Sequence, residues 1–210
     1  MDFKEIKYVD DSIKSIESVD DPTDYICLWK DLDYFDDANN YSKFIKQCEQ
    51  GVRRSKEYKV FINYIKNILG IDFCQVSSHI YGTDATIEMH HGPIFTLYDI
   101  ANVILEYFIK KHKKISTFRI VDCIIDEHFD LCVQVVMLAI TNHEAVHNKD
   151  LFLNVKQGIG DLNKFILKYK DCLTDIQKYK IWYYINMCKS NPSFDRGYLD
   201  IEVMEKEIKL

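Results

Sequence analysis

Apolar and polar positions recur with different periods along the chain, and each change of period predicts a change of element. Residues 41–69 carry apolar side chains at helical spacing, and Gly70 ends this stretch. Residues 73–81 and 85–91 alternate as strands do, and the turn residues Gly82, Thr83 and Asp84 between them predict a hairpin. Residues 1–24 are acidic and irregular, and are predicted to form an extension.

The rest of the chain predicts more helices than strands. Thr96, followed by Asp99 three residues later, predicts the start of a helix that runs to about residue 111. Further helices are predicted over residues 117–129, 143–147, 159–170 and 174–188, and strands over residues 132–139 and 151–155. The sequence therefore predicts an α+β fold that is mostly helical, with helices inserted between the strands of a small core and flanking it.

Composition and charge limit the class of protein. With 47% apolar and 29% charged residues the chain is typical of a soluble globular protein, and no apolar run approaches the ~20 residues of a membrane helix. The start of the chain has no signal-peptide pattern, and the seven cysteines form no C-x-x-C pair. These features predict a cytoplasmic protein with reduced thiols and no membrane partner. The bias towards Ile, Lys, Asp, Asn and Tyr fits an AT-rich genome such as that of a phage.

The negative charge is concentrated at the N-terminus. Residues 1–50 hold 13 acidic and 6 basic side chains, a net charge of −7, whereas residues 51–210 hold 20 acidic and 21 basic ones, a net charge of +1. A protein that coats nucleic acid usually has a clear basic excess, so this balance argues against that class. The acidic segment over residues 1–40 predicts an arm for a protein partner, a DNA mimic that covers a cleft, or, most simply, a solvated extension.

Four of the seven histidines form two clusters that predict a metal site. His143 and His147 are spaced i, i+4, so on a helix both imidazoles project from one face and can share an ion. His90 and His91 are adjacent, so on a strand they point to opposite faces. One of these two could then bind the metal while the other acts elsewhere, an arrangement that favours a hydrolytic metal site.

Both clusters resemble the ββα-metal site of the HNH (His-Me finger) endonucleases, most closely the colicin-type DNases. In that family a strand ends in a Glu-x-His-His sequence shortly before a proline, and an apolar strand later runs into His-x-x-x-His and a polar or basic residue. The matching positions are Glu88, Met89, His90, His91 and Pro93, then Val133–Ile140, His143, His147 and Lys149. The longer string that begins at His90 is also similar to uncharacterised phage proteins.

The resemblance implies a role for each matched residue. His90, His143 and His147 would bind one divalent metal ion, for which three imidazoles suit Zn²⁺ or Ni²⁺ better than Mg²⁺ or Mn²⁺. His91 would be the general base that deprotonates the attacking water. Gln134 stands where the family has an asparagine that orients the base, and its longer amide departs from the family's pattern. Lys149 would contact the DNA substrate, and the short basic cluster that includes Arg53 and Arg54, which is not part of the family match, could line the same cleft.

Two alternatives remain open at this point. His143-Glu144-Ala145-Val146-His147 is the H-E-x-x-H signature of zinc metallopeptidases, in which Glu144 would be the base. However, the chain turns polar directly after His147, has no nearby downstream Glu as third ligand, and leaves His90 and His91 unexplained. The other alternative is a catalytically inactive, metal-stabilised phage structural or interaction protein.

The sequence therefore predicts four regions. They are an acidic extension over residues 1–40, a helical lead-in over residues 41–70, an HNH-like ββα-metal core over residues 71–155 with inserted helices over residues 96–129, and a C-terminal helical region over residues 156–210. The favoured function is metal-dependent hydrolysis of DNA in the cytoplasm of the host cell, with the virion as a second location.

Overall fold

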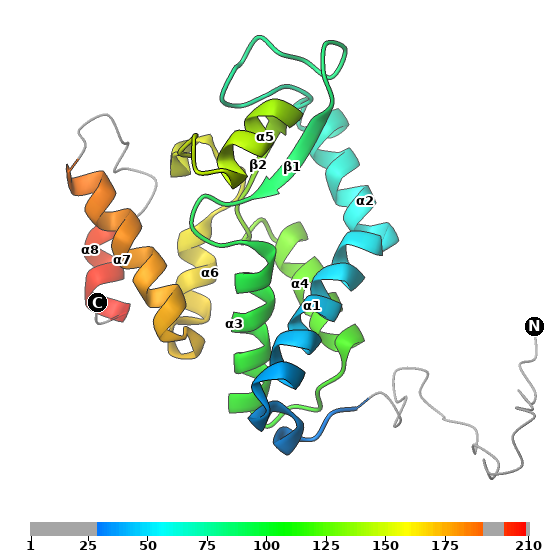
Figure 1. Cartoon of the computed structure of the whole chain (residues 1–210), viewed down its shortest axis with the longest axis vertical. Helices are drawn as coiled ribbons and strands as arrows, with labels where there is room; N and C mark the ends of the chain where they lie inside the picture. Colours follow the sequence, from blue (N-terminus) through cyan, green and yellow to red (C-terminus); the bar gives the residue numbers. More distant parts are fainter. Residues whose placement is uncertain (1–28, 191–199, 209–210) are drawn as a thin grey trace, which may run out of the picture.

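The computed structural model describes residues 29–190 and 200–208, and it is mostly helical around one two-stranded sheet (Figure 1). The acidic segment at residues 1–28 lies outside the described residues. The α-helices are α1 (Ala38–Arg54), α2 (Lys56–Asn63), α3 (Leu97–Lys110), α4 (Thr117–Phe129), α5 (Ile140–His147), α6 (Leu162–Lys168), α7 (Asp175–Ser190) and α8 (Ile201–Ile208). The strands are β1 (Ile87–His91) and β2 (Val135–Ala139), and short turns of other helix types lie at Leu32–Asp36, Tyr64–Ile68, Val155–Gln157 and Lys170–Cys172. The predicted α+β, mostly helical class is confirmed.

The helical lead-in divides into α1 and α2 at Ser55. The Ser55 side chain accepts a hydrogen bond from the Tyr58 amide at 3.1 Å and so caps the start of α2, while its extended backbone ends α1. The buried face of α1 carries Phe44, Ile45 and Cys48, which pack towards α3 and α4. A single capping residue therefore turns one continuous apolar pattern into two helices.

The inserted helices α3 and α4 form the centre of the core. Thr96 and Asp99 form the predicted capping box at the start of α3, each side chain accepting from the backbone amide of the other. Helix α3 is buried on nearly all of its faces, because α1, α4 and the C-terminal helices surround it. These two helices thus separate β1 from β2 in the sequence without separating them in space.

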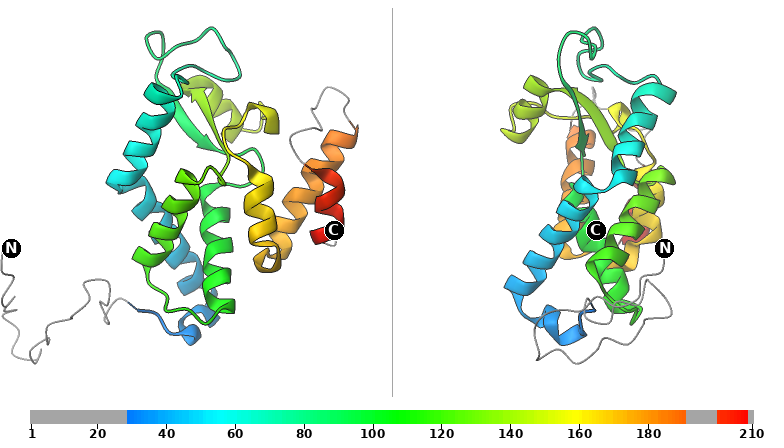
Figure 2. Two further views of the ribbon diagram at one scale, coloured as in Figure 1. Left: turned by 180° about the vertical axis from the view of Figure 1, so that it is seen from behind. Right: turned by 90° about the vertical axis from the view of Figure 1, so that its right-hand side faces the viewer.

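The two strands pair antiparallel, with His90 opposite Val136 and His91 opposite Val135. Burial alternates along β1, so that Ile87, Met89 and His91 face the core whereas Glu88 and His90 face the other way. The right-hand view in Figure 2 shows α5 on one side of the strands and α2 on the other. The alternation of β1 therefore directs its two histidines towards different helices.

The C-terminal helices are fastened to α3 by a buried carboxylate. Asp99 is almost fully buried, and Lys180 of α7 donates to both of its carboxylate oxygens at 2.7 and 2.6 Å. Gln177 lies beside the same carboxylate at 3.4 Å. Because removal of the Lys180 ammonium would leave the Asp99 carboxylate buried without its cation, this pair fixes α7 against the core.

Two predicted strands are absent, and α8 was not predicted. Residues 73–81 form a compact turn with a single bridge from Phe73 to Tyr81 in place of a hairpin strand. Gln75 docks on the edge of β2 instead, since its amide donates to the Met137 carbonyl and its side chain accepts from the Met137 amide. Residues 151–155 are also not a strand, because the segment that pairs with β2 comes later, at Ile159. The predicted hairpin with residues 85–91 was wrong, because residues 73–81 fold back on themselves and contact β2 through Gln75 instead of pairing with β1.

The turn that carries Ile159 to β2 depends on Gly160. Gly160 has φ +102°, and a Cβ atom there would lie 2.2 Å from the carbonyl oxygen of Val133. We expect Gly160→Ala to lower the free energy of unfolding by about 3 kcal/mol or more, because both the backbone angle and the backbone contact are unfavourable. Gly70→Ala is the matched control, since Gly70 has φ +70° but open space around it, and should cost about 1 kcal/mol. Equal losses in urea unfolding would contradict this account of the turn.

Candidate metal centre

Three histidines from β1 and α5 converge on one point. Their ligand nitrogens all lie within 4.8 Å of one another, although His90 is more than fifty residues from the other two in the sequence. The Nε2 atoms of His143 and His147 are 3.1 Å apart. Two nitrogens bound to one tetrahedral ion at about 2.0–2.1 Å would be about 3.3 Å apart, so this pair is already spaced for a shared ligand.

The carboxylate of Glu88 orients the imidazole of His143 by binding Nδ1, the ring nitrogen that faces away from the cluster. His143 Nδ1 lies 2.5 Å from Oε2 of Glu88, and Nδ1–H donates to that oxygen. This hydrogen bond leaves Nε2 as the lone-pair nitrogen and points it towards His147. Metal-binding histidines commonly have such a carboxylate partner, which fixes the tautomer and the direction of the ring. Glu88 reaches His143 because it shares the outer face of β1 with His90.

The electrostatic environment keeps His90 neutral. Burial, followed by the nearby imidazoles of His143 and His147 and the charge of Arg53, lowers the pKa of His90 to about 4. A neutral imidazole has a lone pair available at neutral pH, as metal binding requires. His90 and His143 are half-buried and His147 is exposed. Within residues 29–190 and 200–208 no other Cys, Asp or Glu completes this group, so a fourth ligand would come from solvent.

His91, the predicted general base, lies on the opposite face of β1 and only 4% of it is exposed. Its Nε2 is 2.9 Å from Nε2 of His128, and its ring stacks on Tyr58 of α2. His128 Nδ1–H donates a hydrogen bond to the Ile124 carbonyl at 2.7 Å. The unprotonated Nε2 of His128 therefore accepts a hydrogen bond from Nε2–H of His91. His91 is therefore part of a buried pair and has no access to an attacking water. The sequence predicts His128 only as a satisfied surface or core histidine, and its place beside Ile124 at helical spacing puts it on the inner face of α4.

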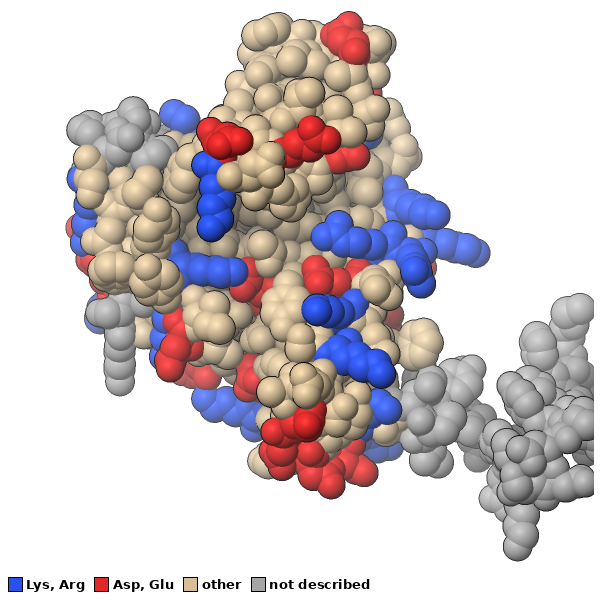
Figure 3. Space-filling view, viewed as in Figure 1, with Lys and Arg blue, Asp and Glu red and all other residues tan. Residues whose placement is uncertain are grey.

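The remaining predicted site residues do not assemble a substrate cleft. Gln134 is buried and donates to the Val155 carbonyl at 2.7 Å, so it fixes the chain after α5 and orients no base. Arg53 and Arg54 are exposed at the end of α1, where Lys and Arg side chains gather beside α2 (Figure 3). The charge of Arg53 reaches His90 and His91, and Lys149 is exposed just beyond α5. Binding of DNA by these residues stays a prediction.

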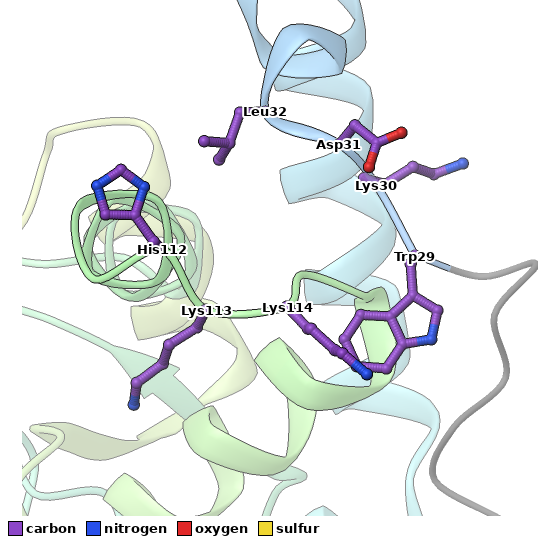
Figure 4. Close-up of a pocket in the computed structure, with 7 residues that line it drawn as sticks. All are labelled: Trp29, Lys30, Asp31, Leu32, His112, Lys113 and Lys114. Carbon is purple, nitrogen blue, oxygen red and sulfur yellow. The ribbon is translucent and has the colours of Figure 1, made fainter.

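A separate hollow lies at the other end of the molecule, between the segment before α1 and the loop after α3 (Figure 4). It has a volume of about 340 Å³ and is lined by Trp29, Lys30, Asp31, Leu32, His112, Lys113 and Lys114. Lys114 Nζ lies 4.4 Å from the centre of the Trp29 ring, a cation–π contact that fills part of the space. The hollow shares no residue with the histidine cluster.

The fold and the cluster define a helical domain in which three histidines can hold a transition metal ion. The chain belongs to the bacteriophage G278-like virion protein family, whose model matches residues 3–209. No curated protein and no solved structure matches it. The helices in the described part of the chain include none with the length and apolar run needed to cross a bilayer. The prediction of a phage protein is confirmed, and the family associates it with the virion.

The family corrects the predicted activity. A virion protein family indicates a structural role, so the prediction of an HNH endonuclease was wrong. The structure gives a physical reason, because the residue assigned as the base is sealed in the core. The strand, strand and helix of the expected core occur in order as β1, β2 and α5, but this order alone does not make a nuclease. The same finding favours the alternative of a phage structural protein.

The buried histidine pair predicts a loss of stability in acid. Burial lowers the pKa of His128 to about 4, whereas an unfolded histidine has a pKa of about 6.5. The unfolded chain therefore binds a proton that the folded chain does not, and stability falls as the pH decreases from about 6.5 towards 4. We expect His128 to account for about 3 kcal/mol of this loss, measured by urea unfolding between those pH values.

The comparison that isolates this effect uses two substitutions. His128→Gln should flatten the pH dependence while lowering stability at pH 7, since it removes the titrating group but disturbs the core. His79→Gln, at an exposed position outside the core, should leave the pH dependence of the wild type unchanged. An unaltered acid slope in His128→Gln would contradict the assignment.

Proposed function

We propose that this protein is a non-enzymatic structural component of a phage particle whose β1–β2–α5 unit is held together by one divalent transition metal ion. The observation that carries the proposal is the convergence of His90, His143 and His147, with Glu88 orienting His143. Membership of a virion protein family supports the structural role. An inactive, metal-stabilised phage protein is the alternative that agrees with both observations.

The packing of α5 explains why a metal ion would be useful there. None of the eight residues of α5 is fully buried, and its apolar contact with the core includes only partly buried side chains such as Val146. Helices of this length are not stable on their own, and most gain their stability from burying an apolar face. The side-chain hydrogen bonds that hold α5 are the Glu88–His143 bond and those from Asn142 to Cys74 and Ser77, and the Ile140 amide also donates to the Thr86 carbonyl. An ion shared by β1 and α5 would add coordinate bonds where the apolar contact is small.

The donor set favours Zn²⁺ or Ni²⁺. Three neutral imidazoles suit these borderline cations, whereas Mg²⁺ and Mn²⁺ prefer carboxylate and water oxygens. Three protein ligands leave one tetrahedral position, which solvent can occupy on the side of the exposed His147. A site with an open position is compatible with a structural role when no base is placed beside it.

The experiment that tests the proposal is zinc binding by the purified protein. We expect one Zn²⁺ ion per chain by calorimetry and metal analysis. At a zinc concentration 100 times Kd, the ion should stabilise the fold by about 2.7 kcal/mol, equivalent to a rise in Tm of about 5–10 °C. Because the large core does not include the site, the protein treated with EDTA should remain folded. Neither binding nor a change in Tm with Zn²⁺ or Ni²⁺ would overturn the proposal.

A ligand variant and a matched control make this test specific. His147→Ala should abolish both zinc binding and the zinc-dependent rise in Tm while leaving the metal-free Tm nearly unchanged, because His147 is exposed. His112→Ala, at another exposed histidine far from the cluster, should retain both. Retention of stoichiometric binding by His147→Ala would show that the ion binds elsewhere.

Substitution of glutamate by glutamine should change the zinc affinity at position 88 but not at position 144. Glu88→Gln should weaken zinc binding by about 10–100-fold, since the amide no longer draws the Nδ1 proton of His143. Glu144→Gln should leave the affinity unchanged, because Glu144 is exposed and contacts none of the three histidines. Titration of both variants with a fluorescent zinc indicator measures the difference, and equal affinities would remove Glu88 from the site.

A further inference from the structure

Helix α7 has a second apolar face that the fold leaves uncovered. Its inner face carries Gln177, Ile181, Tyr184, Ile185 and Cys188, all buried. On its outer face the exposed fractions are 66% for Ile176, 60% for Tyr179, 46% for Trp182 and 49% for Tyr183. These four residues, which we call the α7 stripe, form a continuous patch on two turns of one helix.

The stripe differs from other exposed apolar residues of the described chain. Val60, for example, stands on α2, and Phe118 and Phe129 stand at opposite ends of α4, as single surface hydrophobics commonly do. In Figure 3 uncharged side chains cover the viewer's side of α7, and charged side chains lie at its edges. Contiguous exposed apolar patches of this kind usually mark sites of association.

The aromatic rings of the stripe already contact one another. The ring centres of Tyr179 and Trp182 are 5.7 Å apart, and those of Tyr179 and Tyr183 are 6.3 Å apart. Rings that are ordered before binding lose little side-chain entropy when a partner covers them. The stripe is therefore a preformed surface.

The spacing of the stripe is that of a helix–helix seam. Ile176, Tyr179, Tyr183 and Asn186 follow one another at intervals of three, four and three residues, the repeat that lets two helices pack along their length. Asp175, Trp182 and Lys189 flank this seam at intervals of seven residues. Trp182 thus lies midway between an acidic end and a basic end of the same helix.

We propose that two copies of this chain associate through their α7 stripes, antiparallel across a two-fold axis at Trp182. In that arrangement each Asp175 lies opposite Lys189 of the other copy, so the charges of the flanks match as they do in a self-complementary interface. Lys189 also contacts Glu205 of α8, which holds its side chain at the rim of the seam. A parallel arrangement would instead place like charges side by side.

The area of the stripe sets the expected strength. Large apolar and aromatic side chains bury about 150–250 Å² each, so four side chains that are about half exposed offer roughly 450 Å² per copy. Two copies would cover about 900 Å², close to the about 1,000 Å² of the smallest specific interfaces. We therefore expect a dimer with a micromolar Kd, strengthened when many copies are held together in a particle.

Sedimentation equilibrium of the full chain over the micromolar range tests the proposal. The wild type should pass from monomer to dimer, and Tyr179→Lys and Trp182→Lys should each raise Kd at least about tenfold. Phe118→Lys is the matched control, because Phe118 is 61% exposed on α4, outside the stripe, and should leave Kd unchanged. Measurement with Zn²⁺ and with EDTA separates this association from any mediated by the histidines.

Cross-linking tests the two-fold axis. Trp182→Cys should form a disulfide-linked dimer under mild oxidation at a higher rate than the wild type, whereas Phe118→Cys should not. A monomer at all concentrations, or a dimer that the stripe variants do not weaken, would overturn the proposal. It would equally be overturned if the stripe bound another virion protein while the purified chain stayed monomeric.

Discussion

The alternation of side chains along β1 is the constraint on which the rest of the structure depends. Because neighbouring residues of a strand point to opposite faces, His90 and His91 cannot take part in the same site. Pairing with the fully buried β2 seals one of these faces into the core and leaves the other open to α5. The same alternation places Glu88 beside His90, where it can hold His143.

The two histidine sites differ in the source of their stability. The His91–His128 pair is fixed by burial, by a hydrogen bond and by the rings of Tyr58 and Phe61, so it needs no ligand. The outer cluster lies on a helix without a buried face, and like-charged imidazoles would repel there if they were protonated. A metal ion would stabilise the outer cluster, whereas the His91–His128 pair needs no ion. His90 and His91 are therefore adjacent in the sequence but belong to two sites with different chemistry.

Helix α7 shows how one chain can serve both a core and an assembly. Its inner face is fixed through the ion pair between the buried Asp99 and the half-buried Lys180, while its outer face presents aromatic rings that contact one another. A component of a particle needs surfaces of this kind, since its function is to hold neighbours in place. The proposed metal link and the proposed seam lie on different elements, so either could fail without affecting the other.

Several features could be predicted from the sequence because they depend on neighbouring residues. The capping box of Thr96 and Asp99, the helices α3 and α4, and the i, i+4 relation of His143 and His147 are local properties of the chain. The proximity of His90 to His143 and His147 could be predicted only through resemblance to a family, since β1 and α5 are far apart in the sequence. That resemblance identified the residues of the cluster and gave them the wrong activity.

The remaining features were decided by tertiary structure. The choice of partner for β1 depended on which strand could be buried on both faces, so residues 73–81 became a turn that docks on β2. The role of His91 depended on His128, which no nearby sequence signal connects to it. The exposure of the α7 stripe could not be predicted either, because the sequence pattern of an apolar helix is the same whether one of its faces or both are buried. In each case the deciding quantity was burial, which the whole fold sets.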